Sequence, residues 1–118
     1  MKSNTIVACL ALVALAFAST ATFASSPNLE AAKVLAQPCQ ACHGADGNST
    51  APIYPRLAGQ YADYLARALH EYREGERVNP IMAVYVEKLS DEDIKNLAAY
   101  FSAMPSKLGD LHDHMQGQ

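Results

Sequence analysis

One short motif, Cys39-Gln40-Ala41-Cys42-His43, constrains this chain more than any other feature. On a single helical turn, side chains at positions i, i+3 and i+4 project to the same side, so the two thiols and the imidazole would point the same way. Each thiol could then form a thioether with one vinyl group of a haem, and the imidazole could reach its iron. This C-x-x-C-H spacing is the signature of covalent haem attachment. The motif therefore predicts one covalently bound haem c, with its iron.

Two other readings of the cysteine pair are less favoured. A redox-active dithiol would be expected within a strand–helix–strand pattern, and the sequence shows none. A structural zinc site needs four ligands, and no second cysteine pair is present. His112 and His114 form an H-x-H near the polar end of the chain, which is a poor partner for that geometry.

The first 24 residues are typical of an export signal. Lys2 is followed by an apolar run from Ile6 to Ala18, and Thr22-Phe23-Ala24 is an acceptable cleavage site. The run is shorter than the roughly 20 apolar residues that span a bilayer, so a retained membrane anchor is the less favoured alternative. Cleavage would remove Cys9. We therefore expect a periplasmic chain starting near Ser25, without stable membrane insertion of the mature part.

The formal net charge of the whole chain is −3. Nucleic-acid binding requires clustered Lys and Arg, so this charge argues against nucleic acid as a partner. An acidic surface is compatible with docking to another protein, but the sign of the charge does not identify that protein.

The pattern of apolar residues predicts an all-α fold. A short helix is expected over Leu29–Gln37 with Asn28 as its N-cap, and Pro38 should interrupt it just before Cys39, with the motif on a fresh turn. The segment 43–59 is rich in Gly, Pro, Asn and Ser and predicts a long loop. The clearest helix is 60–74, in which the apolar side chains share one stripe: Tyr61, Tyr64, Leu65, Ala68, Leu69 and Tyr72.

The segment 77–82 is expected to be irregular, with Asn79-Pro80 marking a turn or a helix start. Ser90 and Asp93 have the spacing of a capping box at the start of the last helix, which Met104-Pro105 should end. The domains expected are a signal peptide over 1–24, one haem-binding domain over 25–105, and a flexible tail over 106–118.

A haem iron in an electron carrier usually needs a second protein ligand opposite His43. Met82 is the best candidate, since it lies between two predicted helices where the chain could cross the open face of the haem. Without a haem, a single methionine would more often be a core residue. Other candidates are less well placed: Met104 and Met115 at or beyond the last helix, His70 within a regular helix, and His112 and His114 in the tail.

Several blocks of the sequence, in the same order, resemble class I cytochrome c. They are Cys39-Gln-Ala-Cys-His43-Gly-Ala-Asp-Gly-Asn, Pro55-Arg-Leu-Ala-Gly-Gln60, Asn79-Pro-Ile-Met82, Leu89-Ser-Asp-Glu-Asp93 and Leu97-Ala-Ala-Tyr-Phe101. The likeness is to the short bacterial mono-haem type and to single domains of the periplasmic di-haem type, and it covers about residues 28–104. It implies the cytochrome c fold, with three to five helices packed around one haem c.

The resemblance also implies roles for individual residues. Pro55 would offer its carbonyl to the Nδ1–H of His43, and Leu57 would pack on the haem. Ala31 and Leu35 would meet Leu97 and Tyr100 where the first and last helices cross. Arg56, Arg77 and Asn79 could contact the haem propionates, although solvated loop residues are the better reading. Pro38 departs from what is expected before the first cysteine, which affects the entry angle of the first helix.

The function expected from these features is a soluble periplasmic one-electron carrier, with His43 and Met82 as the axial ligands of the iron and no enzymatic turnover. Its partners would be redox proteins: an oxidase, a reductase or a dehydrogenase. We expect a monomer. One alternative is an electron-transfer subunit of a larger oxidoreductase or respiratory complex. A haem enzyme or gas sensor with an open sixth position is less favoured, and so is a copper or nickel site formed by His112, His114 and Met115.

Overall fold

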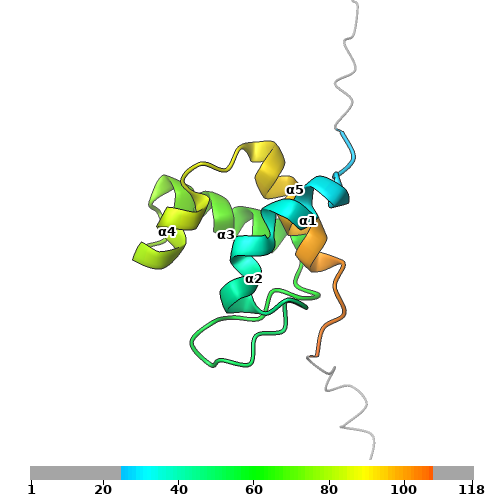
Figure 1. Cartoon of the computed structure of the whole chain (residues 1–118). Helices are drawn as coiled ribbons and strands as arrows, with labels where there is room; N and C mark the ends of the chain where they lie inside the picture. Colours follow the sequence, from blue (N-terminus) through cyan, green and yellow to red (C-terminus); the bar gives the residue numbers. More distant parts are fainter. Residues whose placement is uncertain (1–24, 108–118) are drawn as a thin grey trace, which may run out of the picture.

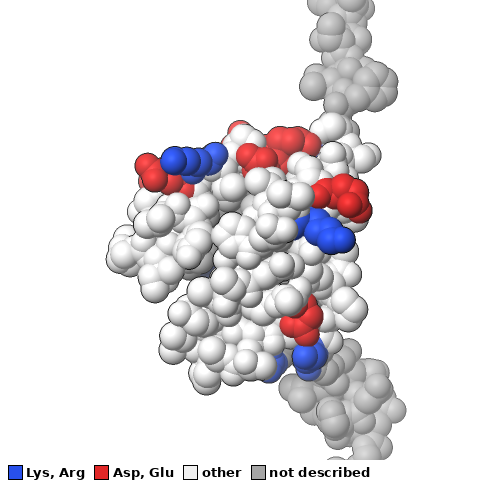
Figure 2. Space-filling model, viewed as in Figure 1, with Lys and Arg blue, Asp and Glu red and all other residues white. Residues whose placement is uncertain are grey.

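The computed structural model describes residues 25–107, and within this range the regular secondary structure consists of helices alone. Their bounds are α1 Leu29–Leu35, α2 Gln37–His43, α3 Ala62–Glu74, α4 Pro80–Val86 and α5 Asp91–Ser102. In Figure 1, α5 lies in the middle of the fold with α1 near it, and α4 lies on the far side of α3. In the same orientation, the charged side chains lie along the upper edge and down the right side of the surface (Figure 2). The described residues therefore have the all-α architecture that the sequence predicted.

The chain around the cysteine motif is two short helices. Asn28 caps α1, as predicted, because its side-chain oxygen accepts a hydrogen bond from the backbone N–H of Ala31. The expected break at Pro38 is present, but the new helix begins at Gln37, so that Pro38 occupies its first turn, where a proline costs no hydrogen bond. Both cysteines and His43 therefore lie within α2.

The long loop after α2 folds back on itself through hydrogen bonds to one carbonyl. The backbone N–H groups of Leu57 and Ala58 both donate to the carbonyl oxygen of Gly47, at 2.8 and 3.0 Å. Gly47 has φ +69°, and a Cβ atom there would lie 3.0 Å from the backbone nitrogen of Ala58. The turn therefore needs a glycine, and it brings residues 55–58 close to the end of α2.

One predicted helix boundary was wrong, and one segment predicted to be irregular is partly helical. The helix predicted from residue 60 begins at Ala62, and Tyr61 is an exposed N-cap residue instead of part of the buried stripe. The segment 77–82 is not irregular throughout, because α4 begins at Pro80; of the two possibilities given for Asn79-Pro80, a turn or a helix start, the structure has the helix start. Asn79 caps this helix by accepting hydrogen bonds from the backbone N–H groups of Ile81 and Met82, and Pro80 lies in its first turn.

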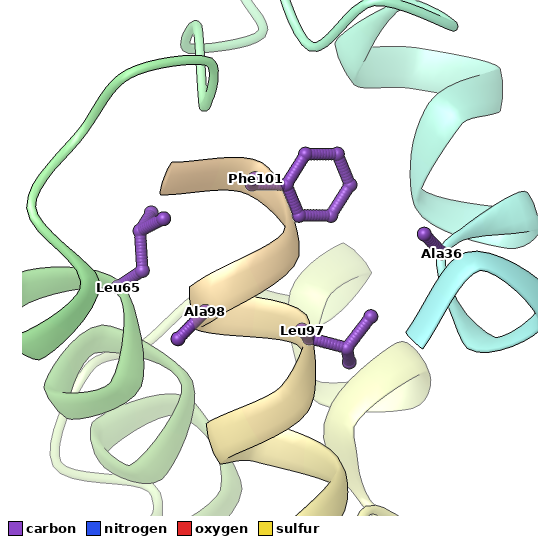
Figure 3. Close-up of a cluster of buried hydrophobic side chains, with 5 residues drawn as sticks. All are labelled: Ala36, Leu65, Leu97, Ala98 and Phe101. Atoms are coloured by element: carbon purple, nitrogen blue, oxygen red, sulfur yellow. The ribbon is translucent and has the colours of Figure 1, made fainter. Parts of the chain in front are cut away.

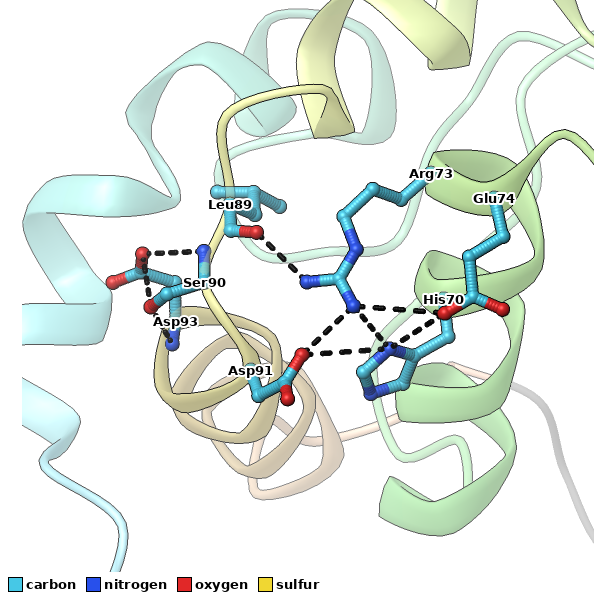
Figure 4. A network of polar contacts seen from close by, with 7 residues as sticks. All are labelled: His70, Arg73, Glu74, Leu89, Ser90, Asp91 and Asp93. Atoms are coloured by element: carbon cyan, nitrogen blue, oxygen red, sulfur yellow. Dashed lines mark hydrogen bonds and ion pairs between the residues drawn. The ribbon is translucent and has the colours of Figure 1, made fainter.

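The start of α5 is fixed by a capping box, as predicted. The Ser90 hydroxyl accepts a hydrogen bond from the backbone of Asp93, while the Asp93 carboxylate accepts one from the backbone of Ser90. Arg73 of α3 ties the same region to its neighbour. It donates to the carbonyl of Leu89 at 2.9 Å and to Asp91 at 2.7 Å, and His70 and Glu74 lie beside it (Figure 4).

The core of the described residues lies around α5. Leu97 and Phe101 point toward Ala36, at the junction of α1 and α2, and Ala98 points toward Leu65 of α3 (Figure 3). Leu35 and Tyr100 pack against this cluster as the resemblance implied. Ala31 does not, because it is exposed; Ala32 and Ala36 are the fully buried alanines of this crossing. The buried alanine within α1 is therefore Ala32, one residue later than expected.

The chain beyond α5 is held to the loop that follows α2. The buried Asn48 side chain donates to the carbonyl of Pro105 at 2.9 Å and accepts from the backbone N–H of Lys107 at 2.8 Å. The Lys107 ammonium lies 2.9 Å from the Asp46 carboxylate. Residues 106 and 107, assigned above to a flexible tail, thus make specific contacts with the domain. The predicted signal peptide and the residues His112, His114 and Met115 lie outside the described residues.

Within residues 25–107, none of the helices is both long enough and apolar enough to cross a bilayer.

Candidate haem site

A largely apolar cavity of about 360 Å³ lies between α2, the loop after it, α3, α4 and α5. The sequence-predicted haem residues all line it: Cys39, Cys42, His43, Pro55, Leu57 and Met82. Core side chains such as Leu97 and Phe101 form part of its wall. The cavity is thus built from segments that are far apart in the sequence.

Helix α2 presents the cysteine motif to this cavity on a single turn. Both thiols are free, since no disulfide joins them. Burial raises the pKa of the Cys39 thiol above its ordinary value. The two sulfurs and the imidazole therefore lie on one wall of the cavity.

The imidazole of His43 is held by the loop. Its Nδ1 lies 2.8 Å from the carbonyl oxygen of Pro55. A carbonyl can only accept, so Nδ1 carries the hydrogen and Nε2 keeps the lone pair with which a histidine binds a metal. The ring is buried and lies on the wall of the cavity.

Tyr54 contributes to the site although the sequence analysis gave it no role. Its ring stands edge-on to the His43 ring, with centroids 6.3 Å apart and an interplanar angle of 64°. A hydrogen bond with the sulfur of Cys42 raises the pKa of the Tyr54 hydroxyl. Tyr54 immediately precedes Pro55, and this adjacency is the signal from which its place could have been inferred.

Met82 lies on α4 and lines the same cavity as the cysteine motif of α2. As the third residue of a capped helix, it has a fixed backbone, and Val86 at i+4 lines the cavity with it. Met104, the other methionine considered within the described residues, packs against the hydrophobic core and does not line the cavity. His70 is engaged with Arg73 on α3, at 3.0 Å.

The three polar residues considered for the propionates also line the cavity, and two of them, Arg77 and Asn79, have protein partners. Arg56 is exposed. Arg77 lies over the ring of Tyr72 at 5.3 Å and 3.6 Å from the Glu71 carboxylate, and a hydrogen bond with Tyr64 raises its pKa. Asn79 uses its side-chain oxygen to cap α4.

No group of three or more His, Cys, Asp or Glu side chains suited to a metal ion occurs in the described part of the chain. The zinc alternative therefore has no ligand set in this range, because a structural zinc site needs four such ligands.

A model of the family described as cytochrome c matches residues 29–105. The chain belongs to the cytochrome c family. It is a class I c-type cytochrome resembling one domain of the di-haem cytochromes, and it carries one covalently bound haem c with its iron. The family match begins at the first residue of α1 and ends after α5, so it covers every helix found in residues 25–107.

Named relatives share a large part of this cytochrome domain. Over 71 residues the chain is 45% identical to cytochrome c4 of Pseudomonas aeruginosa, a match covering 60% of this chain and 35% of that protein. Over 68 residues it is 48% identical to cytochrome c-554(548) of Halomonas halodenitrificans, covering 55% and 82%. A thiosulfate dehydrogenase electron acceptor of Stutzerimonas stutzeri is 44% identical over 72 residues, covering 60% and 33%.

The structural comparison agrees with the sequence comparison. Reduced recombinant cytochrome c4 from Pseudomonas stutzeri superposes with a TM-score of 0.66 at 36% identity, covering 71% of this chain and 49% of that one. The chain therefore spans only about a third to a half of the cytochromes c4 that it matches.

The site geometry fits the haem c of the family. Covalent attachment needs two free thiols one helical turn apart, and α2 supplies them. Iron coordination needs an imidazole nitrogen with a lone pair, which the Pro55 contact leaves on His43. The porphyrin needs an apolar surround, and the cavity between α2 and α4 is largely apolar.

Proposed function

We propose that this cytochrome is a one-electron carrier in which His43 and Met82 are the axial ligands of the haem iron. The observation that carries the proposal is that both residues line the same cavity, His43 from α2 beside the two cysteines and Met82 from α4. The haem supplies the one-electron couple. The role of the polypeptide is to hold the imidazole and the thioether in place as ligands.

Each proposed ligand is held by contacts of its own. The Pro55 carbonyl fixes the rotation of the His43 ring and increases its basicity. The Asn79 cap and Pro80 fix the first turn of α4, which carries Met82. We propose that this support keeps both ligands in one arrangement in both oxidation states, so that little reorganisation accompanies electron transfer.

The ligand pair and its surroundings determine the expected potential. A thioether opposite an imidazole favours reduced iron more than a second imidazole would. Apolar lining, including Leu57, disfavours the additional charge of oxidised iron. We therefore propose a carrier whose reduced form is favoured relative to a bis-histidine haem.

The proposed location is the periplasm, after export directed by residues 1–24. The proposed partners are redox proteins, including dehydrogenases. In support, one relative is named a thiosulfate dehydrogenase electron acceptor. The same name favours a second candidate function, namely that the chain is the electron-accepting subunit of a larger oxidoreductase.

Spectroscopy of the haem-loaded protein tests the proposed ligands. We expect a near-infrared methionine–iron band, and we expect reduced protein to bind carbon monoxide slowly and weakly. Met82→Ala should abolish the band and allow rapid carbon monoxide binding. Met104→Leu is the matched control, because Met104 packs in the core, and it should leave both properties unchanged. A band that survives in Met82→Ala would contradict the proposal and favour another ligand.

Purification from the native source separates the two candidate functions. A free carrier should elute from a sizing column as the cytochrome alone, without other subunits. A stable subunit should elute with a dehydrogenase, and reduction of its haem should follow addition of the substrate of that enzyme.

A further inference from the structure

The loop that carries Pro55 contains a buried polar side chain with no part in the haem site described above. Asn48 is 4% exposed and does not line the cavity. Its amide nitrogen donates to the backbone carbonyls of Asp46 and Pro105, and its amide oxygen accepts from the backbone N–H of Lys107. Burying an amide is costly unless its groups are paired, and a fully paired buried group specifies one arrangement of its partners. Asn48 therefore fixes how the loop meets the chain beyond α5.

The backbone beside Asn48 is bonded to the backbone that follows Pro55. The carbonyl oxygen of Gly47 accepts hydrogen bonds from the N–H groups of residues 57–58, at 2.8 and 3.0 Å. Pro55 lies just before this pair, and its own carbonyl oxygen is 2.8 Å from Nδ1 of His43. The amide of Asn48 is thus connected to the imidazole through short backbone contacts of a single loop.

The chain beyond α5 meets this loop on both sides of Pro55. After Pro55, the N–H of Gly59 donates to the carbonyl of Phe101 at 3.1 Å, and a Cβ on Gly59 would lie 2.7 Å from the Cβ of Ser106. Before Pro55, the contacts are those of Asn48. In Figure 1 the orange segment after α5 descends beside the loop that follows α2. The loop is therefore held at two places, with Pro55 between them.

We propose that Asn48 is a positioning residue for the His43 imidazole. Its hydrogen bonds to residues 105–107, which we call the clasp, hold the loop so that Pro55 keeps its contact with Nδ1. The proposal rests on the proposed role of His43 as a ligand of the iron. When the clasp breaks, Pro55 leaves the imidazole while the core around α5 stays folded. The alternative is that Asn48 stabilises the fold as a whole and that Pro55 stays in place without it.

The contact that the clasp maintains matters for the iron. An acceptor on the second ring nitrogen orients a metal-ligating histidine and raises its basicity, and removing such an acceptor typically costs roughly 10–100-fold in metal affinity or activity. Water that reached Nδ1 of His43 would replace the hydrogen bond from outside without fixing the ring. The exchange of the Nδ1 hydrogen with solvent is therefore the direct measure of whether the clasp holds.

Hydrogen–deuterium exchange followed by nuclear magnetic resonance tests the proposal on the haem-loaded full chain. The protein is reduced and kept under carbon monoxide, so that the iron is low-spin and diamagnetic whether or not Met82 is a ligand. Exchange of a protected hydrogen reports the opening that exposes it, which is local or global. Asn48→Ala removes the clasp, so the Nδ1 hydrogen of His43 should exchange at least about tenfold faster. The backbone N–H of Leu97, which is 1% exposed on α5, reports global unfolding.

Two control variants separate positioning from stability. Ile94→Val removes a methylene from a fully buried residue of α5 that does not line the cavity. It should speed exchange at Leu97 but change exchange at the imidazole less than about twofold, since a local opening leaves this part of the core intact. Lys107→Met removes the exposed ion pair with Asp46 and keeps the backbone N–H that Asn48 binds, so it should also have less than about a twofold effect at the imidazole. An unchanged haem spectrum shows that each variant is folded.

The other outcomes contradict the proposal. If Asn48→Ala speeds exchange at Leu97 but not at the imidazole, Asn48 stabilises the fold without positioning His43. If Ile94→Val speeds both sites equally, the Nδ1 hydrogen is exposed only by global unfolding and the clasp does not control it. Neither result bears on the sixth ligand, which the methionine–iron band tests separately.

Discussion

Replacing Asn48 by alanine should destabilise the protein markedly, although Asn48 lies in a loop and outside the cavity. Its side chain is buried and makes three hydrogen bonds to the backbone. The amide nitrogen donates to the carbonyls of Asp46 and Pro105 at 3.0 and 2.9 Å, and the amide oxygen accepts from the N–H of Lys107 at 2.8 Å. Two of these bonds attach the segment after α5 to the loop after α2.

The magnitude follows from the number of bonds and from the exposure of the partners. Each hydrogen bond contributes about 1 kcal/mol, which gives about 3 kcal/mol for the three. Pro105 and Lys107 are exposed, so water can replace part of this contribution. We expect Asn48→Ala to lower the free energy of unfolding by about 2 kcal/mol, which for a domain of this size lowers the melting temperature by roughly 8–16 °C.

Urea unfolding followed by far-ultraviolet circular dichroism measures this change. The midpoint should fall with little change in the denaturant slope. Thr50→Ala, an exposed residue of the same loop, is the control and should cost less than about 0.5 kcal/mol. In a chain ending at Pro105, where Lys107 is missing, Asn48→Ala should cost about 1 kcal/mol less. An equal cost in both chains would refute the proposed bond to Lys107, and a cost below about 0.5 kcal/mol in the full chain would refute the whole reasoning.

Three further predictions concern the backbone and the polar network. Gly59→Ala should lower the free energy of unfolding by about 2–4 kcal/mol, because φ of Gly59 is +70° and the new Cβ would lie 2.7 Å from the Cβ of Ser106. Gly75→Ala should lower it by only about 1–2 kcal/mol, because φ of Gly75 is +79° but no atom lies within 4 Å of the new Cβ. Urea unfolding of both variants measures the difference. Arg73 holds the pKa of Asp91 below its usual value, so the ion pair stabilises the folded protein. This stabilisation is fully present above the ordinary Asp pKa of about 4, and it is lost as the pH falls through the lowered pKa of Asp91. Asp91→Asn should therefore make stability less dependent on pH below about pH 4 in acid titrations of the unfolding free energy, and an unchanged profile would count against the ion pair. Ser90→Ala should cost about 1 kcal/mol in thermal unfolding, because it removes the cap of α5, and a neutral result would mean that the capping box adds nothing.

The sequence predicted best the features that depend on neighbouring residues. Asn28 and the pair Ser90 and Asp93 cap their helices as expected, because a cap is a contact between residues three positions apart. The C-x-x-C-H motif placed two sulfurs and an imidazole on one turn for the same reason. The contact between His43 and Pro55 spans twelve residues, and it came from resemblance to a family and not from local pattern.

Contacts between distant segments were beyond this kind of reasoning. Asn48 forms hydrogen bonds with Pro105 and Lys107, which lie 57 and 59 positions further along the chain. An asparagine in a Gly-rich loop is usually explained by the turn itself. Ala31 and Ala32 are equivalent in composition, so which of them faces α5 depends on how the two helices pack. Tyr54 has no motif of its own; its position depends on how the loop carries Pro55 to His43.

Met82 lines the cavity, but its backbone differs in part from what the sequence analysis expected. The sequence analysis chose it because the segment 77–82 was expected to be irregular, with Asn79-Pro80 marking either a turn or a helix start. In the structure, Asn79 and Pro80 start a helix at that point, and Met82 lies in its first turn with Val86 one turn further along the same wall. This difference has a physical consequence. A methionine on a flexible loop could move away from an iron at little cost, whereas one on a capped helix can do so only by breaking the cap or changing its own rotamer. If Met82 is the ligand, Asn79→Ala should therefore speed carbon monoxide binding to the reduced protein without removing the methionine–iron band.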